Sequence, residues 1–215
     1  MSDKLLVIGA GGHARSVLDI ALQNNNFAQI ACMDPVYPKL KKVDSLDEIP
    51  IIGTDDDMQS IYEQGYKHVF VALGENKLRH KLFHTAVSIG FEPVNIISSG
   101  ALVSPRANLG RGVCVMAGAI ININTTIDDN CIINTRSSID HDCHIMKSCH
   151  IAPGATLSGC VKLEQGVWIG TGASIVEDIV IEEWSFIGAG AVVINDVEAN
   201  ALYYGTPARK IKQIV

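Results

Sequence analysis

The chain has 215 residues, 47% of them hydrophobic and 19% charged, so it can bury the core of one large domain or of two small ones. Its net charge of −6 and the lack of a broad basic patch argue against nucleic-acid binding. No apolar run reaches the roughly 18 residues of a membrane span, and the N-terminus lacks the layout of a signal peptide, so we expect a cytoplasmic protein without a membrane span.

Apolar runs and amphipathic patterns alternate through the first hundred residues. Buried strands are predicted at residues 4–9, 29–33, 68–73 and 93–97. Helices are predicted around residues 16–22, 56–63 and 77–88, and residues 36–54 look irregular. Strands that alternate with helices predict an α/β domain with a parallel, Rossmann-like sheet.

A glycine-rich turn follows the first predicted strand. Gly11 and Gly12 precede His13 there, and the backbone N–H groups of such a turn can approach a phosphate closely. Asp34 ends the second strand, about 20 residues further on, where a ribose-binding acid stands in dinucleotide-binding domains. We favour a mononucleotide or nucleotide-sugar site built from these four residues and Gly74. A dinucleotide site and a turn needed only for packing are the alternatives.

A six-residue repeat fills the second half of the chain. Every sixth residue from Val103 to Val193 is Ile, Leu or Val, without a miss in sixteen positions. This period is typical of a parallel β-helix, in which three hexapeptides form one coil and the periodic side chains point inward, so about five coils are expected. The repeat has no inserted loop that could serve as a lid. A groove that excludes water would then need a neighbouring copy, and a trimer is the simplest closed arrangement.

Three of the six cysteines obey the same repeat. Cys131, Cys143 and Cys149 each stand four residues after a periodic aliphatic, in a column of small residues. We therefore interpret them as small buried side chains rather than as metal or redox groups.

Two carboxylates flank a histidine within this repeat, whose outward-facing positions are normally small or polar. Asp140, His141 and Asp142 are predicted to occupy a turn and the strand after it. Acyl transfer to an amine or hydroxyl needs a base with a pKa near the working pH, and an adjacent carboxylate raises the basicity of histidine. We interpret His141 as a general base supported by Asp142. His150 is expected to face a ligand and His144 to face solvent, and no metal is expected.

The C-terminal residues carry a basic cluster made of Arg209, Lys210 and Lys212. These side chains either meet the phosphates of a coenzyme or belong to a tail that covers the last open edge of the β-helix.

The whole chain resembles the sugar acyltransferases of the left-handed β-helix type. It is most similar to the bacterial N-acetyltransferases that act on UDP-4-amino-4,6-dideoxy-N-acetylhexoses in the bacillosamine pathway of polysaccharide biosynthesis. The resemblance rests on the segments 9–13, 72–76, 134–142, 150–154 and 205–208, together with Asp34. It implies a nucleotide-sugar-binding domain over residues 1–97, a left-handed β-helix acetyltransferase domain over 98–200 and a C-terminal cap over 201–215.

The resemblance also implies a homotrimer that transfers the acetyl group of acetyl-CoA directly to the 4-amino group of the sugar. His141 matches the general base, Asp142 its carboxylate partner and Asn134 a residue near the sugar amine. Gly11, Gly12 and His13 would lie near phosphate, and Asp34 and Gly74 near the uridine. On the coenzyme side the implied residues are His150 near the thioester, Gly159 as an oxyanion donor, and Thr171 and Ala189 beside the pantetheine.

One departure concerns Pro35, a predicted substrate-site residue beside Asp34, where related chains often carry a second polar residue. Because proline has no N–H to donate, Pro35 weakens the prediction of a particular contact with the nucleobase or the ribose. The alternatives are a sugar O-acetyltransferase of the sialic-acid type and an acetyltransferase for a GDP- or dTDP-linked amino sugar. A serine-acetyltransferase-like enzyme and a non-catalytic protein that binds a nucleotide sugar are further alternatives.

Overall fold

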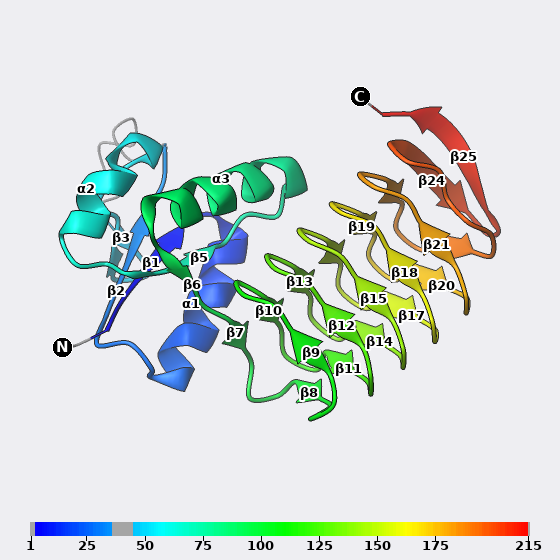
Figure 1. The fold of residues 1–215 in the computed structure, drawn as a ribbon, viewed down its shortest axis with the longest axis horizontal. Helices are drawn as coiled ribbons and strands as arrows, with labels where there is room; N and C mark the ends of the chain where they lie inside the picture. The colour runs from blue at the N-terminus through cyan, green and yellow to red at the C-terminus, as the bar shows by residue number, and fades with distance from the viewer. Residues whose placement is uncertain (1–2, 36–44, 215) are drawn as a thin grey trace. The chain divides into compact units, whose positions relative to one another are not determined.

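A computed structural model describes residues 3–35 and 45–214 of this chain (Figure 1). The chain divides into two compact units, Met1–Ile96 and Ile97–Val215. Among the described residues, no helix has both the length and the apolar character needed to cross a membrane.

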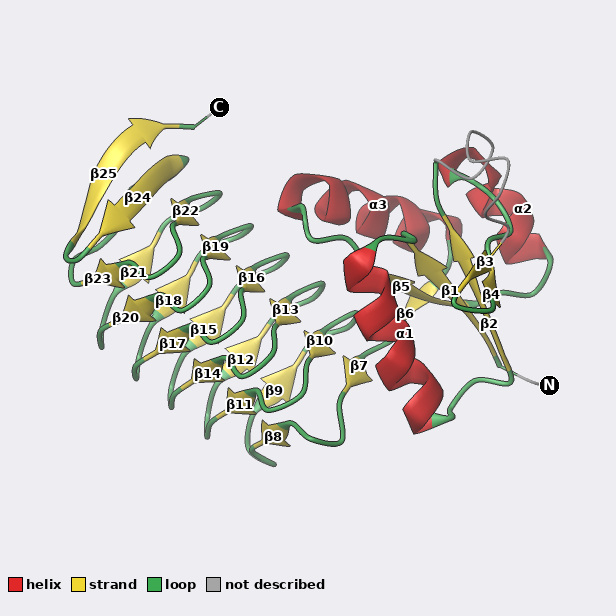
Figure 2. Ribbon diagram, turned by 180° about the vertical axis from the view of Figure 1, so that it is seen from behind, coloured by secondary structure: helices red, strands yellow, loops and turns green. Residues whose placement is uncertain are grey.

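The first unit is a four-stranded parallel sheet with helices, as the alternating pattern predicts. Its strand order is β2-β1-β5-β6, and its core includes Leu6 and Val69 from the sheet with Ile61 and Phe83 from two helices. The strands are β1 Lys4–Ile8, β2 Gln29–Met33, β5 His68–Val71 and β6 Glu92–Pro93. The helices are α1 Gly12–Asn24, the 3-10 turn η1 Asp55–Asp57, α2 Met58–Glu63 and α3 Asn76–Ile89 (Figure 2).

Two expectations for this unit need correction. Part of the segment expected to be irregular forms an antiparallel pair, β3 Ser45–Leu46 with β4 Ile49–Pro50, while residues 36–44 lie outside the described residues. The strand expected at 93–97 is two strands in different sheets. Its end, β7 Ile96–Ile97, joins the β-helix because residue 97 stands one full coil, 18 residues, before Val115, and Ser98 N–H donates to the carbonyl of Val115 at 2.8 Å.

The second unit is a three-sided parallel β-helix, which confirms the predicted fold class (Figure 1). We call its sides the first face (β7, β10, β13, β16, β19, β22), the second face (β8, β11, β14, β17, β20, β23) and the third face (β9, β12, β15, β18, β21). Corner 1 denotes the turns from the first face to the second, and corner 2 the turns from the second face to the third. The strands are β8 Leu102–Val103, β9 Asn108–Leu109, β10 Cys114–Val115, β11 Ile120–Ile121, β12 Thr126–Ile127, β13 Ile132–Ile133, β14 Ser138–Ile139, β15 His144–Ile145, β16 His150–Ile151, β17 Thr156–Leu157, β18 Lys162–Leu163, β19 Trp168–Ile169, β20 Ser174–Ile175, β21 Val180–Ile181, β22 Phe186–Ile187 and β23 Val192–Val193.

The periodic aliphatic side chains form the core of the β-helix. Ile133, Ile151 and Ile169 pair in register on successive coils, and each is 0% exposed. Burial of one such side chain stabilises the fold by about 1.5–3 kcal/mol. Cys131, Cys143 and Cys149 belong to the same buried cluster, which confirms their interpretation as core residues.

The C-terminal segment forms the last edge of the first face. β24 Ala201–Gly205 pairs in parallel with β22, and β25 Ala208–Gln213 pairs antiparallel with β24. Lys210 Nζ lies 2.6 Å from a carboxylate oxygen of Glu198. These contacts support the edge-covering role of the basic tail, because charged edge strands discourage pairing with other chains.

Candidate active site

His141 and Asp142 lie in a corner 2 turn between β14 and β15. The turn holds both residues completely, and the strand that we expected to include part of this segment begins only at His144. Asp142 has a φ of 59°, in the left-handed region that aspartate tolerates better than most residues. The side chains of His141 and Asp142 are 50% and 49% exposed, so a substrate can reach them.

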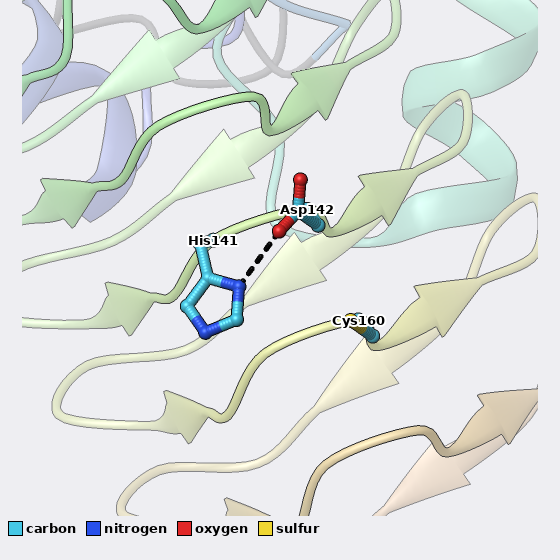
Figure 3. Close-up of side chains that lie close together, drawn as sticks. All are labelled: His141, Asp142 and Cys160. Atoms are coloured by element: carbon cyan, nitrogen blue, oxygen red, sulfur yellow. Dashed lines mark hydrogen bonds and ion pairs between the residues drawn. The ribbon is translucent and has the colours of Figure 1, made fainter.

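A short hydrogen bond joins the two side chains. His141 Nδ1 lies 2.8 Å from Asp142 Oδ2 (Figure 3). This bond is the main cause that raises the pKa of His141 above its ordinary value, and the same bond lowers the pKa of Asp142. With the Nδ1 proton donated to the carboxylate, Nε2 carries the lone pair of the imidazole. The pair is therefore arranged as a base and its orienting carboxylate.

Two asparagines on the preceding coil hold this turn in place. Asn124 Nδ2 donates to Asp142 Oδ1 at 3.1 Å, and Asn122 Nδ2 donates to Asp140 Oδ1 at 2.9 Å. Asp140 Oδ1 also accepts the backbone N–H of His141 at 2.8 Å. Sequence reasoning missed Asn124, although the 18-residue coil places it directly beside Asp142.

Gly159 lies one coil beyond His141, at the same position of the turn. A Cβ at Gly159 would stand 2.6 Å from Cε1 and 2.8 Å from Nε2 of the His141 ring. The imidazole therefore lies against the backbone of Gly159 and occupies the space that a side chain at position 159 would need. The structure thus brings three predicted residues together at corner 2.

A second group of predicted residues lies on the first face and at corner 1. Asn134 Nδ2 is 3.1 Å from His150 Nε2, and Asn134 Oδ1 accepts the N–H of Thr135, which orients the amide toward the imidazole. His150 is buried, and its ring packs against Trp168 with a centroid distance of 4.1 Å and an interplanar angle of 55°. These contacts fix the imidazole in one position.

Thr171 and Ala189 follow at corner 1 on later coils, and both are exposed. Gly190 N–H donates to the carbonyl of Thr171 at 2.9 Å, which stacks the two turns. Within one chain, this corner and the corner that carries His141 stand at opposite ends of the second face. A single copy therefore does not gather all the predicted β-helix residues into one cluster.

The predicted nucleotide-site residues gather at the carboxyl edge of the parallel sheet in the first unit. Asp34 Oδ2 accepts the N–H of Ala10 at 2.8 Å, which joins the ends of β1 and β2. Gly9 has a φ of 107°, and a Cβ there would stand 2.9 Å from Leu73 at the end of β5. The edge between β1 and β5 is where the chain order of the sheet reverses, the usual ligand position in such sheets.

The glycine turn itself is open. Gly11 is the N-cap of α1 without a side-chain cap, and a Cβ at Gly11 or Gly12 would meet nothing within 4 Å. An uncapped helix N-terminus with open space beside it suits an anion. Pro35 follows Asp34 and is exposed, and it contributes no N–H to this edge.

A buried arginine supports this edge, and sequence reasoning missed it. Arg79 is 1% exposed, and its Nη1 donates to the carbonyls of Leu73 and Gly74 at 3.1 Å each. Burial, and then the charge of Arg79, lower the pKa of His13 to about 4, so this imidazole is neutral at pH 7. The signal was present in the sequence, because Arg79 shares the apolar face of α3 with Leu82 and Phe83.

Comparisons with known proteins agree with this architecture. Residues 4–86 match the family model described as the PglD N-terminal domain, and residues 160–195 match bacterial transferase hexapeptide repeats. A solved structure of perosamine N-acetyltransferase from Caulobacter crescentus, in complex with CoA and GDP-perosamine, is 36% identical. The match covers 97% of both chains with a TM-score of 0.90, and that protein is a variant in which one histidine is replaced by asparagine.

The chain belongs to the left-handed β-helix sugar N-acetyltransferases. A second member, the acetyltransferase domain of PglB from Neisseria gonorrhoeae in complex with acetyl coenzyme A, is 32% identical. That match covers 98% of this chain and 100% of the other, with a TM-score of 0.90. GDP-perosamine N-acetyltransferase of Escherichia coli O157:H7 is 28% identical over an alignment of 177 residues. That match covers 77% of this N-acetyltransferase and 74% of the other protein.

Proposed function

We propose that this N-acetyltransferase transfers the acetyl group of acetyl-CoA to the amino group of a nucleotide-linked amino sugar, with His141 as general base. The observation that carries the proposal is the exposed His141–Asp142 pair, whose 2.8 Å hydrogen bond leaves Nε2 for the substrate. Relatives that bind CoA or acetyl-CoA support the choice of acyl donor.

In the proposed reaction the sugar amine attacks the thioester carbonyl. His141 Nε2 takes a proton from the attacking nitrogen, and Asp142 stabilises the imidazolium. The tetrahedral intermediate then collapses to the amide, and the CoA thiolate leaves and receives this proton from the imidazolium. The backbone N–H of Gly159, which lies against the His141 ring, is the proposed donor to the developing oxyanion. The step needs neither a metal nor an acyl-enzyme.

The proposed acceptor is the 4-amino group of a UDP-linked 4-amino-4,6-dideoxy sugar. A GDP-linked amino sugar is the second candidate. Its support is the 36% identity to the Caulobacter enzyme in complex with GDP-perosamine. In both cases Gly11, Gly12 and His13 would contact the phosphates. Asp34 and Gly74 would lie beside the nucleoside.

The proposed active form is a homotrimer. His141 lies at corner 2, whereas Asn134, Thr171 and Ala189 lie at corner 1. When three-sided prisms pack around a threefold axis, corner 2 of one copy can face the first face and corner 1 of the next. His150 beside Asn134 would then stand near the thioester, opposite the base of the neighbouring copy.

The test is a panel of UDP-, GDP- and dTDP-linked 4-amino sugars, each with its 4-hydroxy counterpart, incubated with acetyl-CoA. We expect acetylation of an amino sugar, and a loss of about 10²–10⁴-fold in kcat for His141→Ala, the usual contribution of a general base. His144→Ala serves as a matched control, because His144 also lies near a carboxylate, Asp128, at 3.5 Å but on the third face. Near-normal turnover by His141→Ala, or turnover only of the hydroxy sugars, would contradict the proposal.

A further inference from the structure

An exposed thiol stands beside the proposed base. Cys160 is exposed, whereas the other five cysteines are buried. One ligand atom each from Cys160, His141 and Asp142 lie within 4.8 Å of one another (Figure 3). We propose that these three side chains form a zinc-binding site whose occupation inhibits the enzyme.

The backbone already holds the three residues in place. Cys160 N–H donates to the carbonyl of His141 at 3.0 Å, so two adjacent coils are joined directly at the site. Asp142 and Cys160 stand one coil apart at the same turn position, with φ values of 59° and 60°. With Zn–S about 2.3 Å and Zn–N about 2.0 Å, tetrahedral ligand atoms lie roughly 3.5 Å apart. The three ligand atoms lie within 4.8 Å of one another, so side-chain rotations that move them by about 1 Å bring them to this spacing.

The donor set favours zinc over magnesium and calcium. A thiolate, an imidazole and one carboxylate match the ligands of tetrahedral Zn²⁺, whereas Mg²⁺ and Ca²⁺ require mostly oxygen ligands. All three side chains are exposed, so water can complete the coordination. The thiol releases its proton to solvent when the metal binds.

Zinc at this position removes the base. Coordination by His141 either occupies Nε2 or displaces the hydrogen bond between Nδ1 and Asp142, and in both cases the imidazole no longer accepts the amine proton. Within the described residues, no other group of three His, Cys, Asp or Glu side chains has its ligand atoms this close together. The metal is an inhibitor here and has no part in the transfer step.

The first experiment measures metal binding without turnover. The full chain is treated with EDTA, dialysed and titrated with cobalt chloride, because Co²⁺ bound to a thiolate gives a near-ultraviolet charge-transfer band. We expect the band in the wild type, its loss in Cys160→Ser and its displacement by zinc sulphate. His144→Gln, which alters a histidine–carboxylate pair without a thiol, should keep the band. A wild type without the band, or a Cys160→Ser variant that keeps it, overturns the site.

The second experiment measures inhibition, and this part alone rests on the proposed function. Acetylated sugar is followed by mass spectrometry, because free CoA itself binds zinc. A few-fold molar excess of zinc over enzyme should lower the wild-type rate at least tenfold, with recovery in EDTA, while Cys160→Ser keeps more than half of its metal-free rate. Equal inhibition of both proteins, or activation by zinc, contradicts the proposal. A cobalt band in a protein that acetylates no sugar would refute the proposed function and leave the metal site standing.

Discussion

Replacing Gly159 by alanine tests how closely the imidazole of His141 must be placed. A Cβ at this position would stand 2.6 Å from Cε1 and 3.1 Å from Nδ1 of the ring, whereas ordinary carbon contacts begin near 3.5 Å. The ring must therefore move by about 1 Å. A displacement of that size can cost about 10²-fold in rate, so we expect kcat to fall roughly 100-fold.

Little stability should be lost in the same variant. The ring that must yield is the half-exposed end of a flexible side chain, and the φ of Gly159 is not in the left-handed region. The backbone N–H of residue 159 is also kept, so the variant separates the position of the ring from oxyanion stabilisation.

The assay is steady-state kinetics with the preferred sugar, together with a thermal melt of the free protein. Gly100→Ala is the matched control, because it also lies in a turn of the β-helix and an added Cβ there would find its nearest neighbour at 3.7 Å. A Gly159→Ala variant with more than a third of the wild-type kcat would refute the reasoning. A large loss of melting temperature with the activity would refute it as well, because the effect would then be one of folding.

Three further predictions concern the base, the core and the glycine turn. The proposed mechanism needs neutral His141, and Asp142 raises the pKa of this histidine. Asp142→Asn should therefore lower kcat and move the acid limb of the pH–rate profile to lower pH, and an unmoved limb would count against the pairing. Ile151→Ala should destabilise the protein by about 2–5 kcal/mol in urea unfolding, because the side chain is 0% exposed, while Ile120→Ala, at a residue 42% exposed, should cost far less. The folded-state pKa of His13 is lowered from 6.5 to about 4, so the stability it contributes is present above pH 6.5 and is lost as the pH falls toward 4. That loss is on the order of 3 kcal/mol, and His13→Asn should flatten this part of the stability–pH curve measured by thermal melts; an identical curve would contradict the burial argument.

The sequence predicts the β-helix well because each of its contacts is a fixed step along the chain. A residue meets its partner 18 positions away, so the period alone places Cys143 in the core and His141 at a turn. The boundary between the units was less clear, since Ile97 fits both an apolar strand run and the repeat. Only the pairing of Ser98 with Val115 decides between them.

Contacts that depend on tertiary folding escaped prediction. Helical spacing places Arg79 on the buried face of α3, but the carbonyl groups that it meets after β5 depend on how α3 packs on the sheet. The thiol of Cys160 was also overlooked, although the 18-residue step sets it beside Asp142. Its exposure separates it from the other five cysteines, which are buried.

Because the coils stack at a constant interval, the number of residues between two turns determines their separation along the axis of the β-helix. Each 18-residue coil adds about 4.8 Å, so the turn of His141 and the turn of Ala189 differ by 48 residues, or about 13 Å along the axis. The distance between the proposed base and the proposed coenzyme-binding turns can therefore change only in steps of one strand spacing. Evolution or design can lengthen or shorten that reach by inserting or deleting one coil, with every other pairing left in register.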